Sequence, residues 1–213
     1  MPLAEEQPTE IYRELSKGKT ARFDLKRVHL LTCAARVFAD QGYEKASMRQ
    51  VAQAADFSLA GLYHYVSCKE ELLFFIQYHT FGLLTEWLEE LLQRDGSPES
   101  QLREMVLHHV KYQVDHLSEL KLCATELDSL GGDFYQQVLD RRQRYFELTR
   151  QIIKRLGDSG QALRIDPNLA ALYLFGMLNW IVMWFDPQRN DPKELADSLV
   201  ELFLNGIKKT SLP

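Results

Sequence analysis

Apolar residues recur at three- and four-residue intervals along most of the chain, and this spacing puts them on one face of an α-helix. Leu25, Val28, Leu31 and Phe38 follow it and predict a first helix over about 24–41. No run of alternating β-branched residues and no Asn-Gly turn indicates a strand. Such a chain buries its apolar faces by packing helices together, so we expect an all-α fold.

Capping and breaking residues divide the chain into about nine predicted helices. Ser47, Ser58 and Ser67 precede apolar segments and suit N-caps, and Glu70 would complete a capping box with Ser67. Gly42 suits the C-terminal end of the first helix. The predicted helices cover residues 24–41, 48–55, 59–65, 68–94, 98–117, 119–127, 133–156, 167–185 and 192–204.

The charges are distributed unevenly along the 213 residues, of which 46% are hydrophobic. Residues 13–69 carry ten Lys and Arg against five Asp and Glu, whereas residues 70–213 carry 15 against 22. A basic front part suits phosphates and an acidic rear part suggests a second task. We therefore expect a flexible arm over 1–22, a basic domain over 23–69 and an acidic domain over 70–213.

Several classes of protein fit the sequence poorly. The acidic start lacks the layout of a signal peptide, and the apolar stretch 169–185 contains Gly176 and Asn179, which favours a buried helix or an interface over a membrane span. We expect a cytoplasmic protein that does not engage a membrane. Cys33, Cys68 and Cys123 form no Cys-x-x-Cys pair, so structural thiols are expected, with a redox role for Cys68 left open.

Residues 47–66 read as two short helices joined by a tight turn, which is the helix-turn-helix arrangement of DNA-binding proteins. The turn needs one residue with positive φ, and Asp56 tolerates that conformation better than most residues do. Leu62 and Val66 lie four residues apart and can face the core. The remaining side chains of the second helix are then left for its outer face, although aromatic residues filling a small three-helix core are an alternative.

The residues on that outer face suit contact with DNA. Tyrosine hydroxyls can donate to phosphates, Arg49 can reach a base or a phosphate, and Lys69 lies at a helix start where a phosphate can bind. Gly61 and Ala60 have almost no side chain, so the backbone there can approach the bases closely. The predicted DNA-binding residues are Ser47, Arg49, Ser58, Leu59, Ala60, Gly61, Tyr63, His64, Tyr65 and Lys69.

The segment AARVFADQGYEKASMRQVAQAADFSLAGLYHYVSCKEELL (34–73) resembles the DNA-binding domain of the tetracycline-repressor (TetR) family. The resemblance implies a homodimeric regulator, usually a repressor. Residues 23–69 would be its helix-turn-helix DNA-binding domain, which binds a palindromic operator, and residues 70–213 its ligand-binding and dimerisation domain. It implies phosphate contacts by Ser47, Tyr63, Tyr65 and Lys69 and places Arg49, Leu59, Ala60 and Gly61 nearest the bases. The sequence departs from the family pattern at Asp56, Phe57 and Cys68, which leaves the operator sequence open.

The last two predicted helices are candidates for the dimer interface. The helix from Pro167 is apolar nearly all round, so both of its faces must be covered. The family resemblance implies a four-helix interface made with the partner subunit, although a purely intramolecular core is an alternative. The candidate interface residues are Leu174, Leu178, Ile181, Leu195, Leu199, Leu202 and Phe203.

A small hydrophobic effector would bind among the middle helices, in a pocket with apolar walls and a few polar groups. The same residues could instead form ordinary core. His109 and His116 are seven residues apart with no partner at helical i, i+4 spacing, so no metal site and no cofactor are predicted. The candidate effector-binding residues are Trp87, Met105, His109, Tyr112, His116, Arg142, Tyr145, Phe175 and Asn179.

The effector class rests on a second resemblance. Residues 176–207 look like regulators of fatty-acid or steroid breakdown that respond to acyl-coenzyme A thioesters. The coenzyme phosphates could be held by Arg141, Arg142, Arg144 and Arg150. A solvated basic face of the helix is the alternative for these arginines. A regulator of efflux or detoxification that binds an aromatic or cationic drug is the alternative. An α-helical acyl-processing enzyme and a scaffold without DNA binding are remote ones, because no catalytic or nucleotide-binding motif is present and no catalytic residue is predicted.

Overall fold

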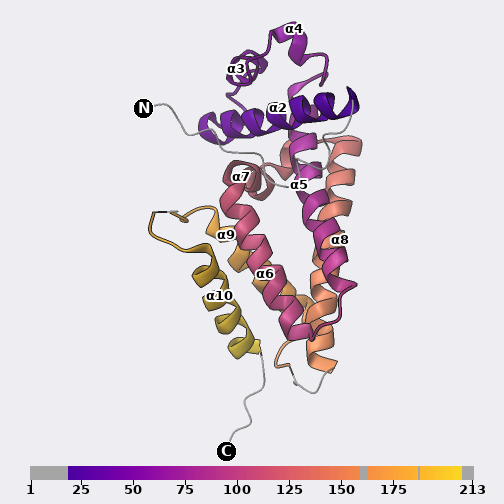
Figure 1. Cartoon of the computed structure of the whole chain (residues 1–213), viewed down its shortest axis with the longest axis vertical. Coiled ribbons are helices and arrows are strands. Elements are labelled where there is room, and N and C mark those ends of the chain that lie inside the picture. The colour runs from indigo at the N-terminus through magenta and orange to yellow at the C-terminus, as the bar shows by residue number, and fades with distance from the viewer. Residues whose placement is uncertain (1–18, 159–162, 187, 208–213) are drawn as a thin grey trace, which may run out of the picture. The chain divides into compact units, whose positions relative to one another are not determined.

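The computed structural model describes residues 19–158, 163–186 and 188–207, and the predicted arm over 1–22 lies largely outside them. These residues form nine α-helices, α2 to α10, and one 3₁₀ helix, η1, with no strand among them (Figure 1). The all-α prediction is therefore confirmed. The chain separates into two compact units, Met1–Ile76 and Gln77–Pro213, so the boundary lies inside α5, Lys69–Leu92.

The first unit is built on α2 (Lys19–Gln41), which begins five residues before its predicted start. It packs against α3 (Met48–Ala54), and α3 packs against α4 (Leu59–Leu62). The expected core residues Leu62 and Val66 are buried. Burying a leucine or valine side chain contributes about 1.5–3 kcal/mol, so the burial of Leu62 and Val66 holds the short α4 in place.

The turn between α3 and α4 has the predicted chemistry. Asp56 has φ 56° and is the only residue other than glycine with positive φ in the described part of the chain. Ser47 and Gln50 form a capping box at α3, and the Ser58 hydroxyl accepts from the Gly61 amide at α4. Local side-chain hydrogen bonds therefore set both helix starts.

Two predictions about these helices are wrong in detail. The helix α4 ends at Leu62 rather than residue 65, and Tyr63 to Tyr65 continue as turns. At the start of α5, the amide of Ser67 donates to Glu71 rather than to Glu70 as the predicted capping box requires. Because α5 begins at Lys69, the carboxylate of Glu71 lies within reach of the Ser67 amide.

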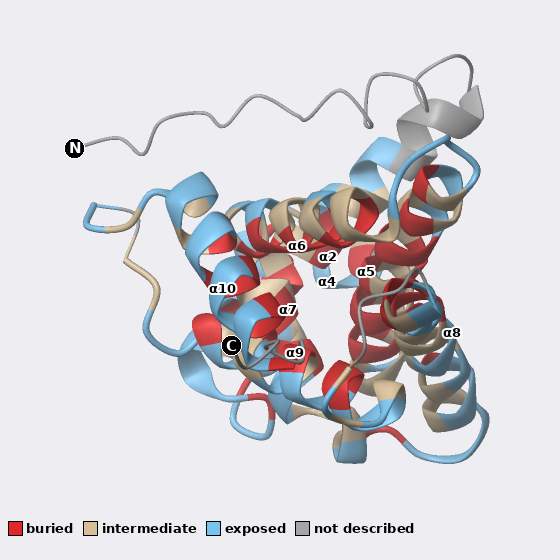
Figure 2. Ribbon diagram, turned by 90° about the horizontal axis from the view of Figure 1, so that it is seen from below, coloured by how far each residue is buried: buried red, intermediate tan, exposed pale blue. Residues whose placement is uncertain are grey.

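In the second unit, α6 packs between α8 and α10, and α9 packs against α8 (Figure 1). Inward-facing side chains of these helices make one apolar core, and in Figure 2 the buried residues of α10 line its inner side while its outer side is exposed. The helices are α6 Pro98–Asp115, α7 Leu117–Thr125, η1 Leu127–Ser129, α8 Gly132–Asp158, α9 Pro167–Ile181 and α10 Pro192–Ile207.

The boundaries of these helices follow their capping residues. Ser97 and Asp166 cap α6 and α9 through their side-chain oxygens, and each is followed by a proline at the first helical position. The predicted helix 167–185 ends earlier, at Ile181. None of the described helices is long and apolar enough to cross a membrane.

Candidate functional site

The outer side of α4 and the turn after it expose the residues predicted to meet DNA. Tyr63 keeps 48% of its surface and Leu59 keeps 38%, and Ala60, His64 and Arg49 are also exposed. Single exposed apolar side chains are common on protein surfaces, so this exposure shows that the residues are accessible to a partner. The arrangement can present a small apolar surface and hydroxyl, imidazole and guanidinium donors to the same partner.

Three of the predicted DNA-binding residues have local tasks in the fold. The hydroxyls of Ser47 and Ser58 accept from backbone amides at the starts of α3 and α4. Tyr65 is half-buried, with its ring edge-on to Phe57 at 5.4 Å between centroids. A DNA contact by these side chains would have to share atoms or surface that the folded unit already uses.

Gly61 has a local reason to be glycine. A Cβ at this position would lie 3.0 Å from the Ser58 hydroxyl oxygen, which accepts the 2.9 Å hydrogen bond from the Gly61 amide. A contact that short requires the capping hydroxyl to shift by a few tenths of an ångström. The N-cap of α4 therefore accounts for this glycine independently of the predicted close approach to bases.

Lys69 is held by backbone carbonyls. Its ammonium group donates to Glu44 O and Ala46 O, each at 3.1 Å, and lies 4.3 Å from the ring centroid of Tyr43. These contacts tie the start of α5 to the loop that precedes α3. An ammonium group has three N–H donors, so one remains for a phosphate.

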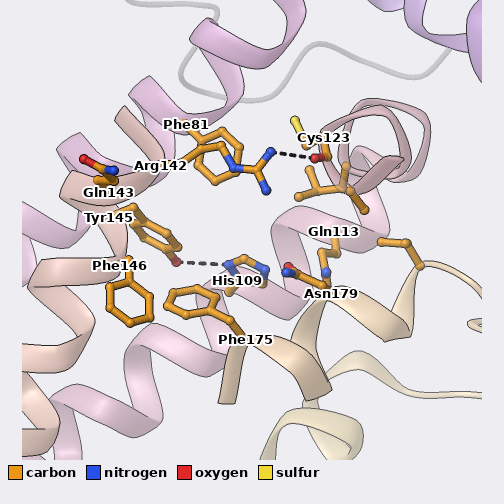
Figure 3. A pocket seen from close by; sticks show the side chains of 13 residues that line it. Phe81, His109, Gln113, Cys123, Arg142, Gln143, Tyr145, Phe146, Phe175 and Asn179 are labelled. Carbon is orange, nitrogen blue, oxygen red and sulfur yellow. Dashed lines mark hydrogen bonds between the residues drawn. The ribbon is translucent and has the colours of Figure 1, made fainter. Parts of the chain in front are cut away.

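A cavity of about 240 Å³ lies inside the second unit, with walls from α5, α6, α7, α8 and α9 (Figure 3). Its walls are mostly apolar and aromatic, as in small-molecule sites generally. Of the nine predicted effector-binding residues, His109, Arg142, Tyr145, Phe175 and Asn179 line it. The other lining residues are Phe81, Gln113, Leu120, Cys123, Ala124, Gln143, Phe146 and Val182.

Four of the predicted effector-binding residues lie away from this cavity. Met105 is fully buried in the helical core. Trp87 stacks on His108, with 3.7 Å between ring centroids, and the rings of Tyr112 and His116 lie 4.3 Å apart. The positions of these residues along α5 and α6 can be read from the sequence, but the spacing does not show which side of each helix faces the cavity.

The polar groups of the cavity centre on His109. Its Nδ1 lies 3.0 Å from the Tyr145 hydroxyl, and burial lowers the pKa of His109 to about 3, assisted by the neighbouring His108. Burial also raises the pKa of Tyr145. Four residues along α6, the Gln113 side-chain amide donates to Leu178 O at 2.9 Å. The cavity is thus polar but uncharged at this wall.

Among the described residues that line the cavity, Arg142 carries the one positive charge. Its guanidinium donates to Cys123 O at 2.9 Å and lies 5.1 Å from the ring centroid of Phe81. No carboxylate within the described ranges forms an ion pair with it. An arginine without an acidic partner beside a cavity suits an anionic ligand group.

The other arginines expected to hold phosphates are already paired. Arg144 binds Glu89 at 2.7 Å, and Arg150 binds Glu147 at 2.6 Å. Arg141 donates to the Tyr78 hydroxyl and lies 3.8 Å from Glu86. The contacts of Arg141 and Arg144 tie α8 to α5, and the Arg150–Glu147 pair lies within α8. Arg142 is left as the candidate for ligand charge.

Sequence reasoning missed several residues of the cavity wall, among them Phe81, Gln113, Cys123 and Phe146. Gln113 carried a usable signal, because it lies four residues after His109 and therefore on the same face of α6. The others come from α5, α7 and α8, and only tertiary packing brings them together. Burial raises the pKa of the Cys123 thiol to about 12, so it adds apolar surface rather than a thiolate.

An apolar groove lies between α9 and α10, but it is lined differently from the predicted interface. The predicted residues Leu174, Leu178, Ile181 and Phe203 are buried in the subunit's own core. Only Leu202, 70% exposed, stands fully outside, with Leu195, Leu199 and Ile181 contributing to the groove floor. The groove is completed by Leu172, Tyr173, Gly176, Met177, Trp180, Trp184 and Ser198.

Comparison with known proteins agrees with this architecture. The family model described as "Tetracyclin repressor-like, C-terminal domain" matches residues 95–207, and "Bacterial regulatory proteins, tetR family" matches residues 30–75. The fatty acid metabolism regulator protein of Bacillus subtilis (strain 168) is 22% identical over 185 residues, which are 85% of this chain and 95% of that protein.

Two solved structures are similar over most of their length. PfmR, a TetR family transcriptional regulator from Thermus thermophilus, has a TM-score of 0.77 and 29% identity, covering 84% of this chain and 99% of that one. AibR, solved in complex with isovaleryl coenzyme A and operator DNA, has a TM-score of 0.75 and 28% identity, covering 83% of this chain and 97% of that one.

The two helical units and the matches to both of them define a helix-turn-helix regulator with a separate sensing unit. The chain belongs to the TetR family, and it is a DNA-binding, ligand-responsive transcriptional regulator. Its relatives are DNA-binding regulators rather than enzymes. Within the described residues, no group of three or more His, Cys, Asp or Glu side chains could hold a metal ion.

Proposed function

We propose that this chain is a homodimeric repressor that binds a palindromic operator and releases it when a small hydrophobic effector, a coenzyme A thioester, enters the cavity of the second unit. The observation that carries the proposal is that cavity, about 240 Å³ of mostly apolar space with a few polar groups on its wall. Proteins bind small ligands in pockets of this composition. The repressor acts in the cytoplasm, where the operator is.

The thioester assignment rests on charge and on similarity. Arg142 places an unpaired positive charge beside the cavity, which favours a ligand with phosphates and disfavours a cationic drug. AibR, with 28% identity, was solved with isovaleryl coenzyme A, and the Bacillus subtilis relative is named for fatty acid metabolism. Both point to acyl thioesters as the class to test first.

The homodimer is supported by the groove between α9 and α10. Trp180 is 64% exposed and Tyr173 is 55% exposed, and they adjoin Leu202. Apolar surface gathered in one place marks a protein interface. A dimer would also present two DNA-binding segments to successive major grooves about 34 Å apart, as a palindrome requires.

The helix α5 offers a route from effector to operator. Its residue Phe81 lies on the cavity wall, and the same helix begins at Lys69, shortly after the exposed residues Leu59, Ala60, Tyr63 and His64. A ligand that shifts α5 would change the spacing of the two DNA-binding segments in the dimer. It does so only if it binds one arrangement better than the other.

The test is a gel-shift assay with the DNA upstream of the protein's own gene. We expect a specific complex that isovaleryl coenzyme A or another acyl thioester dissociates and that free coenzyme A leaves intact. Release only by an aromatic or cationic drug would support the detoxification alternative. If the thioester is instead hydrolysed, the protein is an enzyme.

The DNA-binding surface is tested by Arg49→Ala, with Lys193→Ala on α10 as the charge-matched control. Loss of a base contact lowers affinity by about 1–3 kcal/mol and relaxes the sequence preference at one position. Loss of a phosphate contact weakens binding to all sequences and reduces its salt dependence. Unchanged affinity in Arg49→Ala and in Tyr63→Phe would refute the assignment of this surface.

A further inference from the structure

Two polar side chains on one face of α6 point into the cavity with unused hydrogen-bonding atoms. His109 is 2% exposed and Gln113 is 1% exposed, and the two are four residues apart. His109 Nε2 and Gln113 Oε1 have no hydrogen-bond partner among the described residues. Leaving a buried polar atom unpaired costs about 1–3 kcal/mol, so this pair calls for a ligand that satisfies both atoms.

The partner of His109 determines the character of its free nitrogen. The Tyr145 hydroxyl lies 3.0 Å from His109 Nδ1, and no other acceptor for its proton is found in the described structure. A buried hydroxyl keeps its proton hydrogen-bonded, so Tyr145 donates to Nδ1. In the neutral imidazole the other nitrogen then carries the proton. His109 Nε2–H is therefore a donor directed at the cavity.

The hydrogen bond of Gln113 leaves an acceptor, rather than a donor, free on its side chain. Its Nε2 donates to Leu178 O at 2.9 Å, which fixes the orientation of the side-chain amide. The oxygen Oε1 is left as an acceptor on the cavity wall. Figure 3 shows His109 with Tyr145 on one side and Gln113 and Asn179 on the other. His109 and Gln113 thus present one donor and one acceptor, both uncharged, beside the Asn179 side chain.

We propose that this pair binds the acyl end of a coenzyme A thioester: His109 Nε2–H donates to the thioester carbonyl, and Gln113 Oε1 accepts the nearest amide N–H of the pantetheine arm. The proposal rests on the proposed function and makes it specific, because it names the part of the effector that is read. A thioester and an amide together supply the one acceptor and the one donor that match His109 Nε2–H and Gln113 Oε1.

A free carboxylate fits the same wall poorly. It offers two acceptors and no donor, so Gln113 Oε1 would face another oxygen lone pair. His109, whose pKa burial lowers to about 3, would not supply a positive charge. Arg142 lies elsewhere on the wall, over Phe81, and suits the charged remainder of the coenzyme.

The size and shape of the cavity favour a short acyl chain. Its volume of about 240 Å³ is below the roughly 300–1,000 Å³ of pockets for drug-sized ligands. Phe175 closes it beside His109, with the Phe146 and Tyr145 rings within 5.8 Å of the Phe175 ring. A long straight chain would have to displace these packed rings.

Calorimetric titration with truncated ligands tests the pairing on the intact protein. The isovaleryl thioester of N-acetylcysteamine keeps the carbonyl and the amide N–H but lacks the nucleotide, and its N-methylated analogue lacks the N–H. We expect the parent thioester to bind about ten-fold more tightly than the analogue and than isovalerate, because a site built around a hydrogen bond rejects a ligand lacking it.

Gln113→Met supplies the decisive comparison, and Gln101→Met, at a buried glutamine of the same helix that does not line the cavity, is the control. In Gln113→Met the parent and the N-methylated thioester should bind equally, and in Gln101→Met the ten-fold preference should persist. This ratio compares two ligands on one protein, so it is insensitive to a modest loss of stability.

Failure of this inference is distinguishable from failure of the proposed function. If coenzyme A thioesters release DNA but the N-methylated analogue or isovalerate binds as tightly as the parent, the pairing is wrong and the repressor assignment stands. The same conclusion follows if only the full coenzyme A thioester binds. If no thioester binds or releases DNA, both proposals fall.

Discussion

Acidification should destabilise the second unit through His109. Its ring is fully buried, and burial lowers its pKa from 6.5 to about 3. Folding therefore requires the neutral ring, whereas the unfolded ring takes up a proton below its ordinary pKa. The stabilisation is complete above about pH 6.5 and is lost as the pH falls toward 3. The neighbouring His108, whose pKa burial lowers to about 4, acts in the same direction.

The size of the effect follows from linkage. Each pKa unit corresponds to about 1.4 kcal/mol, so lowering the pH from about 7.5 to about 5 should remove about 2 kcal/mol from the free energy of unfolding through His109. The titratable groups next to the ring are Tyr145 and His108, and the Arg142 guanidinium lines the same cavity over Phe81. None of them is a carboxylate that would stabilise the protonated ring.

The assay is urea unfolding at a series of pH values, at one protein concentration because association contributes to stability. His109→Phe should be less stable near neutral pH, since it leaves the buried Tyr145 hydroxyl unpaired, but its stability should fall less steeply below about pH 6.5. His64→Gln, at an exposed histidine, is the control. Parallel pH profiles for His109→Phe and the unaltered protein would refute the reasoning.

Three further predictions concern the turn, the groove and the start of α5. Asp56→Val should lower the melting temperature by an amount equivalent to about 1–2 kcal/mol, because φ at this position is 56°, whereas Asp56→Gly should leave stability equal or higher. Trp180→Glu should convert the dimer to a monomer, as measured by light scattering. The control Leu169→Glu, on α9 but outside the groove, should remain a dimer. If both variants are dimers, the groove is not the interface. Lys69→Met should lower the melting temperature by removing two hydrogen bonds from a charged donor, each worth about 1.5–3 kcal/mol, whereas Arg49→Met should lower DNA affinity at unchanged stability. An unchanged melting temperature in Lys69→Met would show that its carbonyl contacts contribute little.

The residues that determine local structure were readable from the sequence. Ser47, Asp56 and Ser58 act on backbone groups within a few residues, so their spacing alone predicted two caps and the positive φ of the turn. The helical period likewise predicted the buried positions Leu62 and Val66. These features were predictable because a cap or a turn depends on neighbours along the chain, whatever the rest of the fold does.

Only the tertiary structure decided which faces of the apolar helices turn inward. In α9 apolar residues occur all round, so periodicity could not show that Leu174 and Leu178 face the core while Tyr173 and Trp180 face outward. The tasks of Lys69 and Gln113 were hidden for a related reason. Lys69 binds carbonyls 23 and 25 residues away, and Gln113 binds one 65 residues away. Sequence determines the helices and the caps that act within a few residues, whereas the cavity and its unpaired polar atoms exist only where distant helices pack together.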